Sequence, residues 1–361
     1  MTQREQEILD ILKHEPTISQ QDLAKRLGIT RSSVAVHITN LLKKGYLLGK
    51  GYVVSDEPYV VVIGGSNVDI QGFSKGKLIY QDSNIGEVKI SLGGVGRNIA
   101  ENCARLGIKT RLISVIGDDL YGQKMLKEAQ SIGLNMSDSL ILRNTSTSTY
   151  LCILDETKDM ALAINHMETI EKMSVDFIQT KRSIIERAQL CVLDTNLPQT
   201  VLDYLLTEFP KTVFFVDTVS TTKALKIKTH LKAIHTLKPN QIEAKVLTGE
   251  SDQTLKATAQ ALRDQGLQRC FISLGGEGVY VEDAKISQHC DSPPVEVVNA
   301  TGAGDAFMAG LVYAYLHHES SLEACHTAMA ASKIALSHPD TINPQLSEST
   351  LNQIKKEHSN V

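Results

Sequence analysis

The sequence predicts a small helical head followed by a doubly wound α/β sandwich, in which helices cover both faces of a parallel sheet. Apolar residues recur at helical spacing through residues 3–42, and a polar break follows at 55–58. From residue 59 onward, apolar runs of four to seven residues end at Gly, Asp or Asn and lead into helical stretches. Buried parallel strands that alternate with helices produce this rhythm. We therefore expect a head over 1–54 and a body over 59–350, with ligands at the carboxyl ends of the body's strands.

Composition limits the class of protein. Of the 361 residues, 42% are hydrophobic and 22% are charged, which is ordinary for a soluble globular chain. No apolar run approaches the roughly 18 residues that a membrane span needs, and residues 1–5 lack the apolar core of a signal peptide. The six cysteines show no Cys-x-x-Cys spacing, which argues against a zinc site or a disulfide framework. We expect a cytoplasmic protein with buried, inert thiols.

Three short helices are expected in the head, over residues 3–14, 19–27 and 30–42. A proline follows the first helix and a glycine follows the second, so both end where the apolar spacing ends. Residues 45–54 then alternate and turn like a β-hairpin. This layout resembles the winged helix-turn-helix family.

The resemblance implies that the head binds DNA, with the third helix in the major groove and the hairpin as the wing. The side chains that would face bases or phosphates are those of Arg31, Ser32, Ser33, His37 and, on the wing, Lys50. Residues 1–54 carry eight Lys/Arg and five Asp/Glu, a net charge of +3, which leaves −7 for the rest of the chain. This asymmetry favours nucleic acid as a partner of the head only. The alternative is a packing or dimerisation module that binds no DNA.

The body's strands are expected where the apolar runs lie, at 59–63, 111–116, 190–193, 212–216 and 270–274. Two segments, around 72–92 and 141–165, break the rhythm because they are richer in Ser, Thr and alternating residues. We interpret both as strands of a small sheet that projects from the sandwich as a lid. An exposed sheet needs covering, so we expect a homodimer formed through this lid.

An anion site is expected at residues 302–305. The small-residue turn Gly302-Ala303-Gly304 runs directly into a helix-periodic segment, so its free N–H groups would lie at a helix N-terminus. Asp305 at the edge of this site could accept a proton. An anion site beside a base is suited to transfer of a phosphoryl group to a hydroxyl. The alternative is a tight turn with Asp305 as a helix cap.

Two clusters are expected to hold the acceptor. Asn67 and Asp69 follow the first strand and offer an amide and a carboxylate to paired sugar hydroxyls, or else form an Asx turn. In the run 93–98, Gly94 would let a ligand approach the main chain, and Asn98 begins a helix. A dinucleotide fingerprint is disfavoured because the run does not follow the first strand.

Two further clusters are suited to a nucleotide. Asn240 and Glu243 lie three positions apart at a helix start, where they could order water around Mg²⁺; alternatively they form a cap with a surface glutamate. A glycine-rich strand end could pass under a nucleotide, or be a plain β-turn, and its residues are Gly275, Gly276 and Gly278.

Together these motifs resemble the ribokinase-like, or PfkB, carbohydrate kinases across about residues 59–345. The resemblance implies a three-layer αβα sandwich with a small β lid, and ATP-dependent phosphorylation of a hydroxymethyl group with Mg²⁺. Asp305 would be the base, and the backbone of Gly302, Ala303 and Gly304 would hold the charge of the transferred phosphate. The chain has Asn299 and Ala300 where the family commonly has Asp and Thr. The missing carboxylate argues against the monovalent-cation site that the family often builds nearby.

Further strings resemble the branch of the family that phosphorylates pseudouridine, and they lie at 82–84, 93–100, 146–151, 163–165 and 235–240. The resemblance implies that Asn67, Asp69, Gly94 and Asn98 hold the ribose and that Asn165, on the lid, contacts the base edge. One alternative is a kinase of another nucleoside or sugar, such as inosine, cytidine or ribose. Another is a transcription regulator that only senses a nucleoside. A bifunctional enzyme and regulator is our preferred interpretation.

Overall fold

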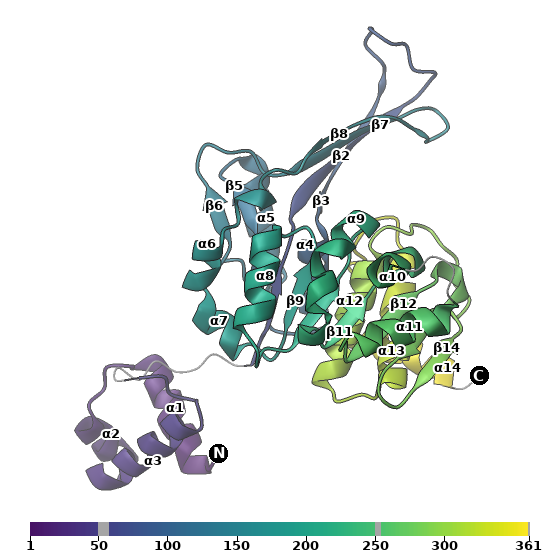
Figure 1. Ribbon diagram of the computed structural model, residues 1–361. Coiled ribbons are helices and arrows are strands. Elements are labelled where there is room, and N and C mark those ends of the chain that lie inside the picture. Colours follow the sequence, from purple (N-terminus) through teal and green to yellow (C-terminus); the bar gives the residue numbers. More distant parts are fainter. Residues whose placement is uncertain (50–57, 250–253, 360–361) are drawn as a thin grey trace. The chain divides into compact units, whose positions relative to one another are not determined.

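The computed structural model describes residues 1–49, 58–249 and 254–359, with side chains described up to Lys356 (Figure 1). The chain divides into two compact units, Met1–Pro58 and Tyr59–Val361. Among the described residues, no helix combines the length and the apolar character that crossing a bilayer requires. The six cysteines are buried and are not joined in disulfides.

The first unit is a three-helix module made of α1 (Gln3–His14), α2 (Gln20–Leu27) and α3 (Arg31–Lys43). Each helix begins at a hydroxyl side chain that accepts from the first turn, and these caps are Thr2, Ser19 and Thr30. The apolar faces meet in one core, whose fully buried members include Ile8, Leu12, Leu23, Val34 and Leu41. Residues 50–54 of the predicted hairpin, Lys50 among them, lie outside the described residues.

The second unit is built on an eight-stranded sheet with the order β14-β13-β12-β11-β10-β9-β1-β4. Six neighbouring strands are parallel: β1 (Val60–Ile63), β4 (Thr110–Ile113), β9 (Cys191–Asp194), β10 (Phe214–Asp217), β11 (Thr236–Lys238) and β12 (Arg269–Ser273). At the edge, β13 (Val279–Glu282) pairs antiparallel with β12, and β14 (Ser287–Cys290) pairs antiparallel with β13. The apolar runs in the sequence did not indicate this antiparallel edge.

Helices cover both faces of the sheet, as the alternation along β1 requires. Val60 and Val62 pack into one apolar cluster, whereas Val61 and Ile63 pack into another. The first cluster includes residues of α4 (Val95–Arg105), α5 (Leu120–Ser131), α12 (Ala303–Leu316), α13 (Ser321–Leu336) and α14 (Glu348–Ser359). The second includes residues of η1 (Ile170–Lys172), α6 (Val175–Thr180), α7 (Arg182–Arg187), α8 (Gln199–Glu208), α9 (Thr221–Ala224), η2 (Leu225–Ala233), α10 (Gln241–Thr248) and α11 (Leu255–Asp264). This is the predicted three-layer sandwich.

A four-stranded sheet projects from the sandwich (Figure 1). Its order is β3-β2-β7-β8, with β2 (Asn67–Ser74), β3 (Gly86–Gly93), β7 (Thr149–Leu154) and β8 (Met160–His166). A separate parallel pair, β5 (Val115–Gly117) and β6 (Leu140–Leu142), lies in the body. Register divides the projecting sheet into two faces. The row Ser91, Asp69, Tyr150 and Asn165 belongs to a polar face, and the row Ile90, Ile70, Leu151 and Ile164 belongs to an apolar face.

Candidate active site

The anion site at 302–305 has the geometry of an uncapped helix start. Gly302 is the residue before α12 and has a φ of +85°, in the left-handed region that favours glycine. A Cβ there would lie 2.1 Å from the carbonyl oxygen of Thr341. No side chain of the described residues caps this end of α12, so its first N–H groups are available to an anion. Asp305 lies inside the first turn, so its interpretation as the helix cap is wrong.

Asp305 is a buried carboxylate with one amide partner. The residue is 9% exposed, and its Oδ2 accepts a 2.9 Å hydrogen bond from Nδ2 of Asn98 on α4. Burial and the nearby charge of Asp217 raise the pKa of Asp305 to about 7, against the opposing effects of Asn98 and Lys238. A carboxylate with a pKa near neutrality suits the role of a general base.

Lys238 is a functional candidate that the sequence analysis missed. It ends β11, and its Nζ forms a 2.8 Å ion pair with Oδ2 of Asp217 at the end of β10. A Cβ on Gly304 would lie 2.9 Å from the same Nζ, so the ammonium lies against the start of α12. Burial opposes its charge, but Asp217, Asp305 and Glu243 outweigh burial and raise the pKa of Lys238. The protein therefore keeps a buried cation beside the anion site.

Asn67 and Asp69 lie side by side on the polar face of β2. Nδ2 of Asn67 donates a 2.7 Å hydrogen bond to Oδ1 of Asp69, so the Asx-turn interpretation is wrong. Burial raises the pKa of Asp69, against the opposing effects of Asn67 and of the charge of Arg97. A Cβ on Gly93 would lie 2.2 Å from Oδ2 of Asp69, and Gly94 has a φ of +100°. These glycines allow β3 and the start of α4 to close against the two polar side chains.

Asn165 lies farther out on the projecting sheet. It is exposed and pairs with Tyr150, which in turn pairs with Asp69. Asp69 and Asn165 are therefore two strand spacings apart, or about 10 Å. Because the three positions share the polar face, a ligand that lies along this row could reach both ends of it.

Asn240 and Glu243 form a reciprocal capping box at the start of α10. Oδ1 of Asn240 accepts from the backbone N–H of Glu243 at 2.8 Å, and Oε2 of Glu243 accepts from the backbone N–H of Asn240 at 2.9 Å. The hydroxyl of Thr218 also donates to Oε2 of Glu243, at 2.6 Å. The cap of the alternative interpretation is therefore real, but Glu243 is not the surface glutamate of that interpretation, because only 6% of the residue is exposed.

A cavity of about 350 Å³ opens beside the anion site. Gly275, Gly276 and Gly278 line it, together with Lys238 and Gly304. The other wall is mostly apolar and includes Val295, Val297, Ala300, Phe307 and Met329. Asn240 is not among the lining residues, since its side chain caps α10. Glycines on one side and apolar side chains on the other suit a flat heteroaromatic ring with phosphates directed toward α12.

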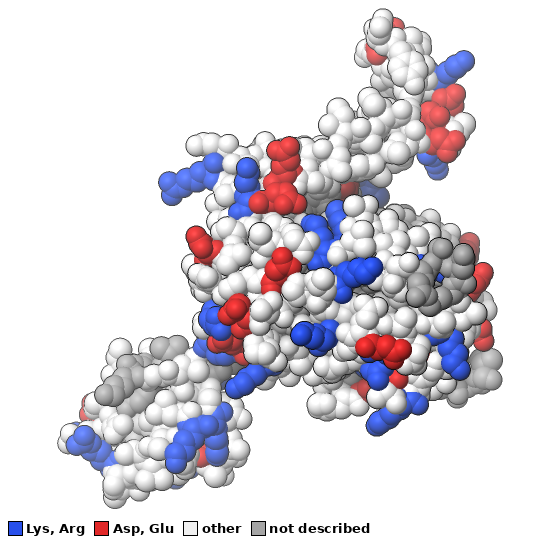
Figure 2. Space-filling view, viewed as in Figure 1, with Lys and Arg blue, Asp and Glu red and all other residues white. Residues whose placement is uncertain are grey.

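On the head, the N-terminal turn of α3 carries Arg31 and Ser32 as exposed residues. Ser32 and Ser33 hydrogen-bond through their hydroxyls to the cap residue Thr30, at 2.9 and 2.8 Å. His37 is half-buried, and its Nδ1 has no partner among the described atoms. Lys and Arg dominate the coloured surface of this unit in Figure 2.

Comparison with known proteins agrees with this geometry. Residues 57–348 match the model of the pfkB family of carbohydrate kinases, and residues 1–47 match a winged helix-turn-helix DNA-binding model. Uncharacterized sugar kinase YeiI of Escherichia coli (strain K12) is 40% identical over 351 residues, covering 96% of this chain and 97% of that protein. Pseudouridine kinase of the same organism is 38% identical over 296 residues, covering 81% and 95%.

Solved structures give the same result. A candidate sugar kinase from Clostridium perfringens has a TM-score of 0.78 and 40% identity, covering 84% of this chain and 97% of that chain. Ribokinase from Thermotoga maritima has a TM-score of 0.69 and 19% identity, covering 83% and 100%, which indicates a shared fold. The predicted fold class is confirmed. The chain belongs to the pfkB family of carbohydrate kinases, phosphotransferases that act on a hydroxyl group, and carries a winged helix-turn-helix module at its N-terminus.

Proposed function

We propose that the protein transfers the γ-phosphate of ATP to the 5′-hydroxyl of pseudouridine. The observation that carries the proposal is Asp305, a buried carboxylate with a pKa of about 7 beside an uncapped helix start. The choice of nucleoside is supported by the 38% identity to a pseudouridine kinase over nearly its whole length.

The acceptor would lie along the polar face of the projecting sheet. Asn67 and Asp69 offer an amide and a carboxylate to the ribose hydroxyls, and Gly94 permits close approach of the main chain. Asn98, through its bond to Asp305, would border the reacting hydroxyl. Asn165 would pair with the edge of the base, because an amide is both donor and acceptor. Movement of this sheet over the bound nucleoside would exclude water.

ATP would occupy the 350 Å³ cavity, with its base between the glycine-rich turn and the apolar wall. The carboxylate set near Lys238 fits Mg²⁺ by its chemistry, since Glu243 and Asp217 supply buried oxygen donors. Glu243 would hold the ion through water, and the bound ion would neutralise phosphate charge. Position 299 is an asparagine and not a carboxylate, so we propose no monovalent-cation site.

The chain's own groups would carry out the transfer. Asp305 takes the proton of the 5′-hydroxyl as its oxygen bonds to the γ-phosphorus and the bond to ADP breaks. The N–H groups of residues 302–305 and the ammonium of Lys238 stabilise the charge that develops on the phosphoryl oxygens.

A panel of acceptors tests this proposal. ADP release and transfer of labelled phosphate would be measured with pseudouridine, uridine, inosine, cytidine and ribose. We expect the highest kcat/KM with pseudouridine and a product phosphorylated at the 5′ position. A higher kcat/KM with another member of the panel would replace the proposed substrate while leaving the reaction class intact.

A second copy of the chain would cover the apolar face of the projecting sheet. Val88, Ile90, Leu162 and Ile164 lie on this face and are 70%, 41%, 59% and 59% exposed. An unpaired apolar sheet face of this kind favours association. A homodimer would also present two DNA-binding heads to a two-fold symmetric site.

DNA binding by the head is a second proposed function. It is supported by the match of residues 1–47 to a DNA-binding model and by the exposed Arg31 at the start of α3. The test is a gel shift with the DNA upstream of the chain's own gene, with and without pseudouridine. Arg31→Ala should weaken the shift, and kinase activity without any DNA shift would leave the head as a packing module.

A further inference from the structure

We propose that Arg97 is a positioning residue for phosphoryl transfer, which acts by fixing the side-chain amide of Asn98 against Asp305. This inference rests on the proposed role of Asp305 as the base. It adds a function for a buried arginine that touches neither the cavity beside α12 nor Asp305 itself.

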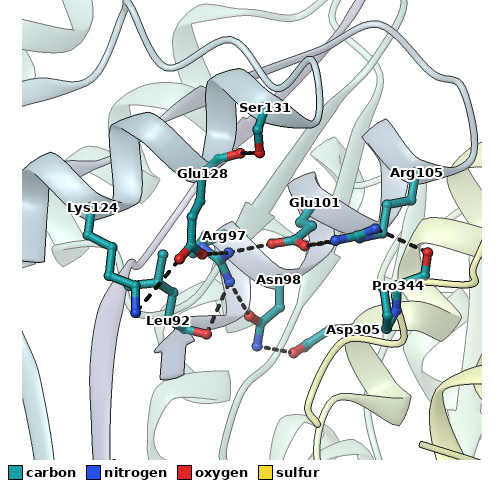
Figure 3. A network of polar contacts seen from close by, with 10 residues as sticks. All are labelled: Leu92, Arg97, Asn98, Glu101, Arg105, Lys124, Glu128, Ser131, Asp305 and Pro344. Carbon is teal, nitrogen blue, oxygen red and sulfur yellow. Dashed lines mark hydrogen bonds and ion pairs between the residues drawn. The ribbon is translucent and has the colours of Figure 1, made fainter. Parts of the chain in front are cut away.

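Arg97 lies in the first turn of α4 (Figure 3). The residue is only 6% exposed. Its Nη1 donates to the carbonyl oxygen of Leu92 at 3.1 Å and to Oδ1 of Asn98 at 3.5 Å. Its Nη2 donates to Oε2 of Glu101, one turn farther along α4. The guanidinium therefore joins the end of β3 to the helix that carries Asn98.

The orientation of the Asn98 amide follows from its two neighbours. Oδ1 faces the guanidinium of Arg97, and Nδ2 donates to Oδ2 of Asp305 at 2.9 Å. A flipped amide would set donor against donor at Arg97 and oxygen against oxygen at Asp305. The arginine and the carboxylate thus select the same orientation, and Arg97 selects it even when Asp305 has gained a proton.

The guanidinium is itself held in place by charged partners. Glu101 bonds to Arg97 through Oε2 and to Arg105 through Oε1, at 2.7 Å for the latter bond. Arg105 also donates to the carbonyl oxygen of Pro344 at 3.2 Å. From α5, Glu128 lies 4.0 Å from Arg97. Burial lowers the pKa of Arg97, and Glu101 and Glu128 oppose that effect.

Loss of Arg97 would change the titration of Asp305 in a defined direction. Charged groups from three strands act on Asp305, namely Lys238 on β11, Asp217 on β10 and Asp194 on β9, while Asn98 bonds to it from α4. The Asn98 bond lowers the pKa of Asp305, so an amide that turns or loosens allows that pKa to rise. The acid limb of the activity profile should then move to higher pH.

The main experiment compares Arg97→Met with Arg105→Gln in the full-length protein. Both remove an arginine bonded to Glu101 on α4, but only Arg97 contacts Asn98. Arg97→Met should lower kcat by about tenfold, the usual size for a hydrogen bond involving a charged group, and shift the acid limb to higher pH. Arg105→Gln should leave the acid limb of the activity profile at the same pH as in the wild type. Equal profiles for all three proteins would overturn the proposal.

A double-mutant cycle tests whether the effect passes through Asn98. In an Asn98→Ala background, Arg97→Met should cause little further loss of kcat. Additive losses would show that Arg97 acts by another route and would overturn the proposal. Arg97→Lys supplies a variant that keeps the buried charge if Arg97→Met does not fold. The acid limb of its pH–activity profile should lie at higher pH than that of the wild type, and an unshifted acid limb would count against the proposal.

Failure of the base assignment can be distinguished from failure of this inference. Asp305→Asn is assayed in parallel with the acceptor that the wild type uses. If Asp305→Asn retains turnover, the proposed base is wrong whatever Arg97→Met does. If Asp305→Asn is inactive and Arg97→Met behaves as the wild type, only the role of Arg97 is wrong.

Discussion

The amide of Asn98 on α4 donates a 2.9 Å hydrogen bond to the carboxylate of Asp305 on α12, although the two residues are 207 positions apart in the sequence. The bond joins the glycine run at 93–98 to the anion site at 302–305. The side expected to hold the acceptor and the side expected to hold the phosphate therefore meet at one carboxylate.

Replacement of Asp305 by asparagine should remove turnover and keep binding. Asparagine has a similar shape and can accept the bond from Asn98, but it cannot take a proton from the acceptor. We expect kcat to fall by about 10²–10⁴-fold, the usual contribution of a general base. Pseudouridine binding by calorimetry should persist. Asp264→Asn, an exposed change on α11, is the control, and activity of Asp305→Asn close to that of this control would exclude Asp305 as the base.

The pH dependence of activity should report the same carboxylate. With a pKa of about 7, Asp305 is protonated in acid and cannot accept a proton. We expect kcat/KM for the nucleoside to rise with pH, to reach half of its maximum near pH 7 and to level off about one pH unit higher. A profile that is already flat from pH 5 upward would contradict a base in this environment.

Asp305 should also reduce the stability of the fold at neutral pH. Its pKa is about 7 in the folded chain against an ordinary value of 3.8, so between these pH values the folded state binds more protons than the unfolded state. Stability therefore falls as the pH rises through this window. The variant Asp305→Asn does not lose stability in this way. The free energy by which it is more stable than the wild type should therefore grow to about 4 kcal/mol by pH 7. Denaturant unfolding at pH 4.5 and pH 8 checks the trend, and a constant difference would refute it.

Lys238 should contribute to both turnover and stability, and the two effects can be separated. Lys238→Met removes a cation beside α12, and we expect kcat to fall by about 10²-fold, as for other groups that stabilise developing charge. It also leaves Asp217 buried without its partner, which should cost about 3 kcal/mol of unfolding free energy. Adding Asp217→Asn should restore stability but not kcat. Recovery of kcat in the double variant would mean that Lys238 serves the fold alone.

The apolar face of the projecting sheet should determine the oligomeric state. Ile164→Glu places a charge on this face, at the edge strand β8, and we expect a monomer in sedimentation analysis where the wild type sediments as a dimer. Leu225→Glu, at a 48% exposed position outside the sheet, should remain a dimer. A monomeric wild type, or a dimeric Ile164→Glu, would exclude this interface.

Much of the architecture follows from local pattern. The buried strands were predictable because both faces of each are apolar, and the anion site because Gly302-Ala303-Gly304 precedes a helical stretch. β11 has only three residues, too few to stand out as an apolar run. The ion pair of Lys238 at this edge of the sheet could not be read from local pattern alone. Its partner Asp217 lies on a different strand, so the ion pair depends on tertiary structure.

Burial of charge was the least predictable property. The sequence left open whether Glu243 is a Mg²⁺ residue or a surface glutamate in a helix cap. In the structure, its carboxylate accepts hydrogen bonds from the hydroxyl of Thr218 and the backbone N–H of Asn240. Nothing in the sequence indicated that Arg97 is buried, because arginine is usually exposed unless it has charged partners. Glu101, one helical turn away, was the only nearby hint of a buried pair.

A crystal structure with pseudouridine and a non-hydrolysable ATP analogue would show directly whether Asp305 and the start of α12 meet the reacting groups. We expect the terminal phosphate at the N–H groups of residues 302–305 and the 5′-hydroxyl within about 3 Å of the Asp305 carboxylate. A terminal phosphate bound elsewhere, or an Asp305 side chain turned away from the 5′-hydroxyl, would contradict this expectation.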